Sequence, residues 1–178
     1  MRLRDVQLGD VDTYVRMRCD PVMMAELGGP LPRDGIEAKV RRDVEDATAD
    51  RAWIQMILVD GNTVAGNVVL WAHDPTSPGE QPMSEIGWMV LPEHQGRGVA
   101  KAAVRMLLRR ARDERRWGIV HAFPGVANGP SNGICRSLGF TLIGEQDTEF
   151  AGRVLRTRHW QIDPSAEETA HRDKGGER

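Results

Sequence analysis

The most informative stretch of the sequence reads Glu85-Ile-Gly-Trp-Met-Val-Leu-Pro-Glu-His-Gln-Gly-Arg-Gly-Val-Ala-Lys101. Its first part, through Leu91, is apolar enough to predict a strand, and a glycine-rich turn follows. From about Arg97 to Asp113 the apolar residues recur with the spacing of one helix face, which predicts an amphipathic helix. A strand that runs through such a turn into a helix is typical of an anion-binding site, because free N–H groups at the helix start point toward the turn.

The glycines of this turn favour a phosphate ligand. Gly96 and Gly98 lack the Cβ atoms that would keep a phosphate away from the backbone, and Arg97 between them can add a charge-assisted contact. Ala100 is small enough to let the helix approach the sheet. Two common nucleotide motifs do not fit: Lys101 stands where a dinucleotide fingerprint needs a third small residue, and the Gly-Lys-Ser/Thr of a P-loop is absent. The stretch therefore predicts a diphosphate site of another kind.

Outside this stretch, the sequence predicts a mixed α/β unit around one sheet. The clearest strand signal is a hairpin, with apolar runs over 53–59 and 64–71 joined by Asp60-Gly61. Further strands are predicted over 117–123, 140–144 and 154–162, and helices around 11–15, 36–44 and 128–138. The proline-rich segment from His73 to Met83 predicts a surface loop.

The composition limits the class of protein. Lysine and arginine together number 24 against 26 aspartates and glutamates, and this net charge of −2 argues against a protein whose main ligand is a nucleic acid. Arginines gather between Arg105 and Arg116 on the polar side of the predicted helix, where they form either a solvated face or a binding patch. The two cysteines, Cys19 and Cys135, lack the spacing of a zinc site and suit a reducing compartment. Because the sequence also shows no secretory or membrane-spanning stretch, we expect a cytoplasmic protein without a metal site.

Two motifs, in order, resemble the GNAT superfamily of acetyl-CoA-dependent N-acetyltransferases. Gln95-x-x-Gly98-x-Ala100 is similar to that family's Gln/Arg-x-x-Gly-x-Gly/Ala signature, and Asn128 and Ser131 followed by Gly139-Phe140 look like its downstream block. The resemblance implies a mixed α/β fold with a mostly antiparallel central sheet of about six or seven strands, a splayed strand pair and about four flanking helices. One domain is expected over 1–162, and the polar segment 163–178 is predicted to be a disordered tail.

The same resemblance implies where coenzyme A lies. Its diphosphate would rest in the glycine-rich turn, and its pantetheine arm would pair with the backbone of the strand before the turn. The residues are Trp88, Met89 and Val90 on the strand, and Gln95, Gly96, Arg97, Gly98, Val99, Ala100 and Lys101 in the turn and helix. Asn128 and Ser131 would also contact the cofactor. From the residues alone, Asn128 is equally a good helix N-cap, whose oxygen can accept from the Ser131 N–H.

Acyl transfer to nitrogen requires a neutral amine, so a base is needed. Glu85 and His121 stand on the two predicted strands that flank the implied gap, and either could accept the proton through water. Many relatives carry an acidic residue near the position of His121, so this histidine departs from the family pattern. The alternatives are that Glu85 is a solvent-facing strand residue and that His121 only packs.

The acid that protonates the departing thiolate is equally open. Many family members carry a tyrosine four residues before the Gly-Phe pair, a position that Cys135 occupies here. Tyr14 is the only tyrosine and is far from the motif in sequence. Because CoA thiolate is a tolerable leaving group, Cys135, Ser131 or water could supply the proton, or no acid is needed. The alternative for Cys135 is a small buried core residue.

Together these features predict an N-acetyltransferase that passes the acetyl group of acetyl-CoA to a primary amine by direct attack in a ternary complex. The acceptor would be a small molecule or a protein N-terminus, since the sequence looks loosely like the ribosomal-protein and aminoglycoside acetyltransferase branches. One alternative is a GNAT-like module that binds CoA or an acyl-CoA as a sensor without efficient turnover, because the usual tyrosine is missing. Another, an RNA-associated protein, would show salt-sensitive binding. The expected partners are the CoA thioester and an amine, without nucleic acid or membrane, in a monomer or homodimer.

Overall fold

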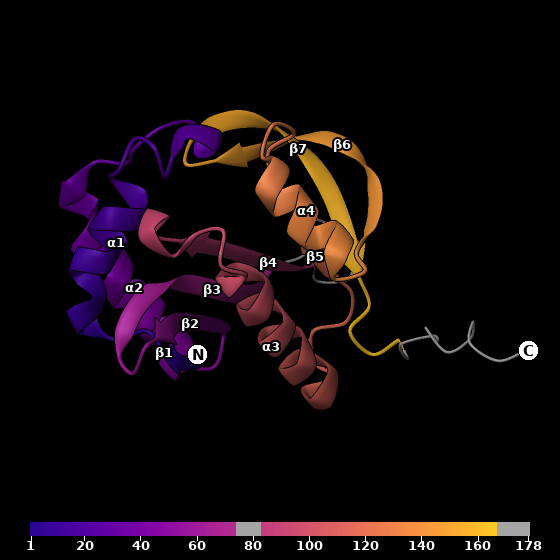
Figure 1. Cartoon of the computed structure of the whole chain (residues 1–178), viewed down its shortest axis with the longest axis horizontal. Helices are drawn as coiled ribbons and strands as arrows, with labels where there is room; N and C mark the ends of the chain where they lie inside the picture. Colours follow the sequence, from indigo (N-terminus) through magenta and orange to yellow (C-terminus); the bar gives the residue numbers. More distant parts are fainter. Residues whose placement is uncertain (74–82, 167–178) are drawn as a thin grey trace, which may run out of the picture.

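The computed structural model describes residues 1–73 and 83–166, which form one sheet of seven strands with helices on both of its faces (Figure 1). The strands lie in the order β1-β2-β3-β4-β5-β7-β6, and every neighbouring pair is antiparallel except β4 and β5. Their bounds are β1 Arg2–Asp5, β2 Ala52–Val59, β3 Thr63–His73, β4 Met83–Val90, β5 Val120–Ala122, β6 Thr141–Phe150 and β7 Arg153–Ile162. The sheet confirms the predicted mixed, mostly antiparallel architecture.

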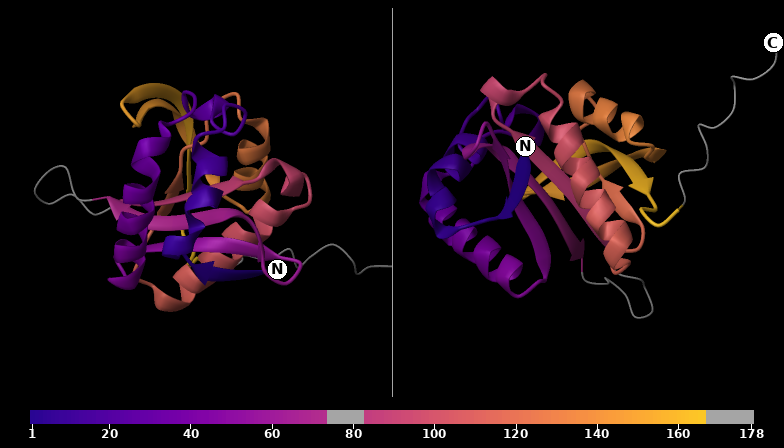
Figure 2. Two further views of the ribbon diagram at one scale, coloured as in Figure 1. Left: turned by 90° about the vertical axis from the view of Figure 1, so that its left-hand side faces the viewer. Right: turned by 60° about the horizontal axis from the view of Figure 1, so that its bottom comes forward.

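Within the described residues, four α-helices cover the sheet, α1 and α2 on one face and α3 and α4 on the other (Figure 2). Their bounds are α1 Val11–Arg18, α2 Ile36–Thr48, α3 Val99–Glu114 and α4 Gly129–Ser137. Short 3-10 helices lie in the connecting segments, namely η1 Leu8–Asp10, η2 Ala25–Leu27, η3 Arg33–Gly35 and η4 Pro92–His94. Each face has its own core: Tyr14 of α1 and Met56 of β2 are buried on one face, and Ile86 of β4 and Leu107 of α3 on the other.

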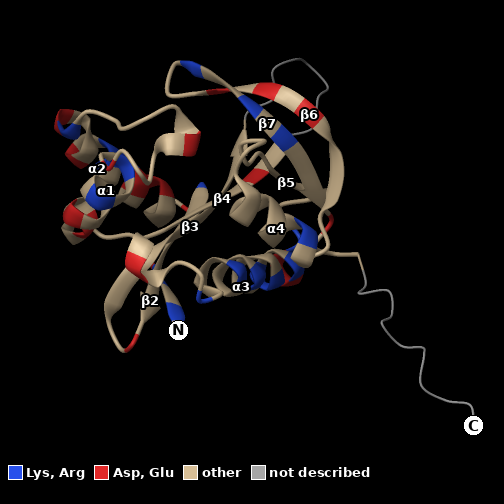
Figure 3. Ribbon diagram, turned by 45° about the horizontal axis from the view of Figure 1, so that its top comes forward, with Lys and Arg blue, Asp and Glu red and all other residues tan. Residues whose placement is uncertain are grey.

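The helix that starts at the glycine-rich turn has the amphipathic character that its sequence predicts. Its apolar side packs on β3 and β4, and its buried residues are Ala103, Val104, Leu107, Leu108 and Ala111. Its arginines are exposed, and Figure 3 shows them as blue segments along α3. Burying a valine or leucine side chain contributes roughly 1.5–3 kcal/mol. This packing therefore fixes the position of the turn relative to β4.

A glycine in β3 lets this strand come close to β4. Gly66 has a φ angle of +153°, and a Cβ atom there would lie 2.0 Å from the Met89 carbonyl oxygen and 2.8 Å from the Val90 Cα. The register of β2 with β3 shifts next to Gly66, as it does at a β-bulge. No residue with a side chain fits at this position without moving the end of β4, from which the turn begins.

The structure departs from the predictions mainly at polar strands. β1 has the sequence Arg-Leu-Arg-Asp, whose single apolar residue gives no strand pattern. β6 continues to Phe150, well beyond the predicted 140–144. Its charged residues leave no apolar alternation that would predict a strand, and its pairing with β7 holds it in place. β5 is shorter than the predicted 117–123. The predicted loop lies, apart from His73 and Met83 at its ends, outside the described residues, as does most of the predicted tail.

Candidate active site

The glycine-rich turn between η4 and α3 is open to solvent. Gly96 and Gly98 have φ angles of +69° and +75°, in the left-handed region that favours glycine. A Cβ atom on either glycine would meet nothing within 4 Å, so the protein itself leaves this volume free. The residues from Gln95 to Gly98 are all exposed. The turn therefore offers bare backbone to a ligand.

Six consecutive backbone N–H groups, from Gly96 to Lys101, have no hydrogen-bond partner among the residues that the structure describes. The next N–H, that of Ala102, donates to the Gly98 carbonyl at 3.0 Å. No side chain caps α3, and its first turn carries no acidic residue. Free N–H groups and the helix dipole favour an anion here, and the side chains of Arg97 and Lys101 add positive charge.

The side chain of Gln95 supports the turn from the protein side. Its Nε2 donates to the Val90 carbonyl oxygen at 2.8 Å and lies 3.7 Å from the sulfur of Met23. Its backbone N–H is bonded to the Pro92 carbonyl at 3.2 Å. Gln95 therefore ties the turn to the end of β4, and the free N–H groups begin at the residue after it.

β4 and β5 separate directly after they pair. Their parallel register covers only Ser84 with Val120 and Glu85 with His121. Among the described residues, positions 86–90 of β4 therefore have no strand on the side of β5. This opening is the splayed strand pair that the sequence predicts.

The peptide groups of Trp88 and Val90 face this gap. The Leu91 N–H donates to the Ala65 carbonyl at 2.8 Å, so by the alternation of an antiparallel pair the Met89 peptide also faces β3. Trp88 and Val90 alternate with these residues and face the other way. The Val90 carbonyl is already bonded to the turn, which leaves the Val90 N–H for a ligand. The predicted pairing of a pantetheine arm with this strand thus depends on the peptide groups of Trp88 and Val90. The Met89 peptide faces β3 in this register and is not available to the arm.

The start of α4 has the cap that its sequence predicts. The Asn128 side-chain oxygen accepts from the Ser131 N–H at 3.0 Å. Both residues are partly exposed. The cap alternative for Asn128 is confirmed, while contact of Asn128 and Ser131 with a cofactor stays a prediction.

Asn132, which the sequence analysis misses, organises this end of α4. Its buried Nδ2 donates to the carbonyls of Gly125 at 2.9 Å and Asn128 at 2.8 Å, and its Oδ1 accepts from the Trp160 Nε1 at 2.9 Å. The amide therefore joins the loop before α4 to β7. No local signal indicates this role, since Trp160 is 28 residues away in the chain.

Glu85 lies on the sheet face that α1 and α2 cover. Its register partners are Trp71 on β3 and His121 on β5. Its Oε2 lies 2.6 Å from the Nε2 of His73 at the end of β3, a contact that the sequence does not indicate. Burial raises the pKa of Glu85, and the adjacent His73 partly opposes this rise.

His121 is paired with a second histidine. Its Nδ1 lies 2.7 Å from the Nε2 of His159 on β7, and the Phe123 ring lies beside that of His159 with centroids 4.7 Å apart. Both imidazoles are partly exposed. Burial lowers the pKa of both histidines, and the charge of His159 lowers that of His121 further. Both effects disfavour the protonated rings.

Cys135 is a core residue of α4. Its side chain is fully buried on the side of α3, and burial raises the pKa of its thiol to about 12. Tyr14, on α1, is also fully buried, and its hydroxyl donates to the Asp43 carboxylate at 2.7 Å. These surroundings favour the packing alternative for Cys135 and keep the single tyrosine away from the gap.

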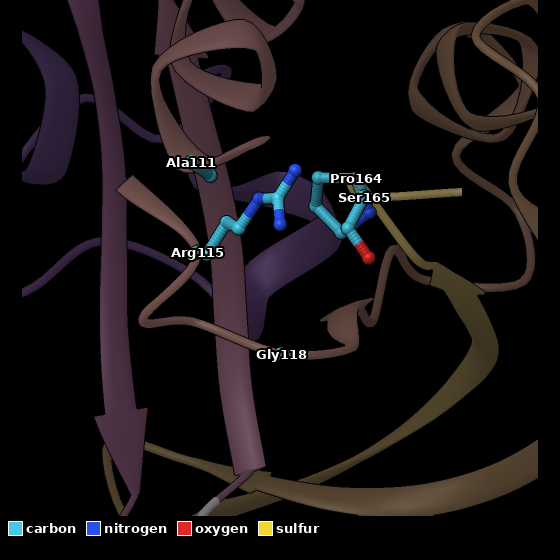
Figure 4. Close-up of a pocket in the computed structure, with 5 residues that line it drawn as sticks. All are labelled: Ala111, Arg115, Gly118, Pro164 and Ser165. Carbon is cyan, nitrogen blue, oxygen red and sulfur yellow. The ribbon is translucent and has the colours of Figure 1, made fainter. Parts of the chain in front are cut away.

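Away from the turn and the gap, the described residues include a pocket, but no cluster of metal-binding side chains and no membrane-spanning helix. A pocket of about 200 Å³ lies where α3 ends, and it is lined by Ala111, Arg115, Gly118, Pro164 and Ser165 (Figure 4). The length of α3 separates this pocket from the glycine-rich turn. In residues 1–73 and 83–166, no three His, Cys, Asp or Glu side chains gather closely enough to hold a metal ion. None of the helices in these ranges has both the length and the apolar character needed to cross a membrane.

The open turn at a helix N-terminus and the gap beside β4 together form a candidate site for an anionic ligand that extends along the strand. Residues 1–141 match the family model described as an acetyltransferase (GNAT) domain. The protein belongs to the GNAT acetyltransferase family, which confirms the resemblance inferred from the two motifs. A comparison with curated protein sequences found no match.

Solved structures of this family share the fold. An acetyltransferase from Bacillus anthracis is 18% identical with a TM-score of 0.73, covering 92% of this chain and 95% of that one. A ribosomal-protein-alanine N-acetyltransferase from Brucella melitensis is 19% identical with a TM-score of 0.72, covering 92% of this chain and 99% of that one. The Microcin C7 self-immunity acetyltransferase, solved in complex with acetyl-CoA and AMP, is 18% identical with a TM-score of 0.71, covering 90% and 91%. At these identities the likeness shows the fold.

Proposed function

We propose that this protein transfers an acetyl group from acetyl-CoA to a primary amine of a small molecule or a protein N-terminus, by direct attack in a ternary complex. The observation that carries the proposal is the run of N–H groups without partners from Gly96 to Lys101, next to the gap beside β4. Such a run at a helix start suits a diphosphate. Membership of an acetyltransferase family, and a structural neighbour solved with acetyl-CoA, support the same donor.

In this proposal the turn and the gap bind different parts of acetyl-CoA. The amides of 96–101 would hold the diphosphate, with Arg97 and Lys101 adding charge, and Asn128 and Ser131 would add polar contacts at the start of α4. The Val90 N–H faces the gap, where it would donate to the thioester carbonyl and stabilise the negative charge that develops on its oxygen. Acetyl-CoA supplies the activated acetyl group.

The amine would approach from the sheet face that carries Glu85 and His121. It must be neutral to attack the thioester. At pH 7, deprotonating a lysine-type amine with a pKa near 10.4 costs about 4.6 kcal/mol, whereas an α-amine with a pKa near 8 costs about 1.4 kcal/mol. A carboxylate or an imidazole is a weak base, so the proposed site is better matched to an α-amine or to another amine of lowered pKa.

Two measurements test this function. Calorimetry measures the binding of acetyl-CoA, and release of free thiol measures transfer to peptides with free N-termini, N-terminally blocked lysine peptides, aminoglycosides and simple amines. We expect acetyl-CoA to bind and thiol release to require a primary amine. The absence of heat on titration would contradict the donor, and binding without release on any amine would contradict transfer.

The second candidate function is a module that binds CoA or an acyl-CoA without efficient turnover. It is favoured by Cys135, which stands where many family members have the tyrosine that protonates the thiolate. The thiol is buried and weakly acidic, so it does not replace that tyrosine. The amine panel separates the two functions, because only the enzyme releases thiol in proportion to acceptor.

We expect the Cys135→Ala variant to keep the affinity for acetyl-CoA and at least about a tenth of kcat, because a thiol of such high pKa gives the departing thiolate little help. Calorimetry and thiol release measure the two quantities. Cys135→Ser is the matched variant, since it returns a polar proton donor of similar size. A much larger loss of kcat in the alanine variant, restored by serine, would assign the acid role to this position.

A monomer or homodimer in the cytoplasm, acting without nucleic acid, stays a prediction. Two arginines of the cluster between Arg105 and Arg116 are already paired, Arg110 with Glu114 at 2.9 Å and Arg116 with Asp50 at 2.7 Å. We therefore expect no salt-dependent binding to an RNA or DNA oligonucleotide in a fluorescence anisotropy titration. A strong dependence of affinity on salt would contradict this expectation.

A further inference from the structure

We propose that His121 and His159 work as one base, in which His121 accepts the proton of the acceptor amine and His159 positions His121 and shares the charge. The inference rests on the proposed function. It adds His159, which no motif indicates, and it chooses between the two candidate bases, His121 and Glu85.

The histidine pair lies toward the gap between β4 and β5, and the Glu85 carboxylate is bonded on the side away from this gap. Glu85 and His121 are register partners at the point where β4 and β5 separate. Glu85 is bonded to His73, which lies toward the start of β4 and away from the opening. His121 is bonded to His159, which lies two residues before its register partner Gln161, in the direction of the opening. An acceptor at the gap therefore meets the imidazoles before the carboxylate.

The hydrogen bond between His121 and His159 leaves one ring nitrogen of the pair free to accept a proton. When Nδ1 of His121 donates to Nε2 of His159, the Nε2 of His121 has a free lone pair. After this atom takes a proton, the Nδ1 proton can shift along the 2.7 Å bond, which moves the positive charge to His159. In the opposite tautomer the free lone pair lies on Nδ1 of His159. In both arrangements the pair holds one added proton over two rings.

Titratable groups also lie on the elements next to the pair. From β4 and β3 these are Glu85 and His73. From η2 it is Glu26, whose Oε2 lies 3.4 Å from the position of a Cβ atom on Gly125, and Gly125 forms a bridge to β7 at Thr157. Burial disfavours the protonated form of both rings, which keeps the pair available as a proton acceptor.

The proton balance of the reaction is complete with this pair. The ammonium form of the amine gives one proton to the pair, and the neutral nitrogen then forms a bond with the acetyl carbon while the carbon–sulfur bond breaks. The second proton of the amine ends on the sulfur, directly or through water. The pair returns its proton to solvent through the partly exposed rings.

The pH dependence of kcat/KM tests the pair, with melting temperatures measured to show that each variant folds. In the unchanged protein we expect kcat/KM to fall in acid with a midpoint below the ordinary histidine pKa of 6.5. His121→Gln should lower kcat/KM at pH 7 by about 100-fold or more and remove this acid limb. His159→Gln keeps a hydrogen-bonding group, so it should lower kcat/KM by only about tenfold. It should also move the limb to higher pH, because the charge of His159 no longer lowers the pKa of His121.

A titration of the imidazole NMR signals tests the pairing without turnover, since His159→Gln should raise the pKa of His121. Arg158→Gln, at the neighbouring position of β7 and on its opposite side, is the matched control and should leave both readouts unchanged. An unchanged His121 titration in His159→Gln overturns the pair. If Glu85→Gln removes the acid limb and His121→Gln keeps it, the carboxylate is the base and this inference is wrong, although acetyl transfer stands. If the unchanged protein releases thiol with no amine, the proposed function fails first and the base role fails with it.

Discussion

Replacing Gly66 by alanine is expected to lower the free energy of unfolding by about 3 kcal/mol or more. A Cβ atom there would lie 2.0 Å from the Met89 carbonyl oxygen and 2.8 Å from the Val90 Cα, and both are backbone atoms of a central strand. A flexible side chain could move aside, but here β3 or β4 must shift as a whole. Urea unfolding followed by circular dichroism measures the change.

The matched control for this substitution is Gly118→Ala. Gly118 also has a positive φ angle, +58°, but a Cβ atom there would meet nothing within 4 Å. Its cost is therefore backbone strain alone, about 1–2 kcal/mol. If the two variants unfold at the same urea concentration, the close approach of β3 and β4 at Gly66 does not limit the fold.

Replacing Gly98 by asparagine is expected to weaken the binding of acetyl-CoA by about 100-fold, equivalent to about 2.8 kcal/mol. Asparagine tolerates the left-handed backbone of Gly98, whose φ is +75°, so the turn keeps its shape. The new side chain enters the free volume above the N–H groups, where the diphosphate is proposed to lie. Calorimetric titration of acetyl-CoA measures the loss.

Gly118→Asn separates loss of binding from loss of stability. Gly118 is also left-handed with free volume around it, but it lies beyond the far end of α3. We expect both asparagine variants to melt at similar temperatures and only Gly98→Asn to lose affinity. Wild-type affinity in Gly98→Asn would remove the turn from the proposed coenzyme site.

The glycine-rich turn and the helix after it could be predicted because their signals are local. The glycine spacing of Gly96 and Gly98 and the helical period of α3 both lie within one short stretch of chain, and the structure places them as the sequence indicates. The polar strands could not be predicted in the same way. β6 presents charged residues to solvent along most of its length, so no apolar alternation marks it, and only its pairing with β7 reveals it.

The acceptor side depends on contacts between distant residues, which a single sequence does not show. His121 is a visible candidate base, but its bond to His159 spans 38 residues and requires the register of β5 with β7. The bond of Glu85 to His73 spans the segment of residues 74–82 in the same way. The sequence also does not show that the Gln95 side chain is bonded to the carbonyl of Val90, and contact of Gln95 with the coenzyme stays a prediction.

The match to the family model ends at residue 141, which divides the molecule along the chain. The glycine-rich turn and the strand that faces the thioester lie before this point, whereas nearly all of the β6–β7 hairpin, with His159, follows it. In our proposal the groups that hold the coenzyme lie before this point, whereas the proposed base joins both segments, with His121 before it and His159 after it. Chimaeras that exchange the β6–β7 hairpin between related enzymes should therefore keep the coenzyme affinity of the parent that supplies residues 1–141.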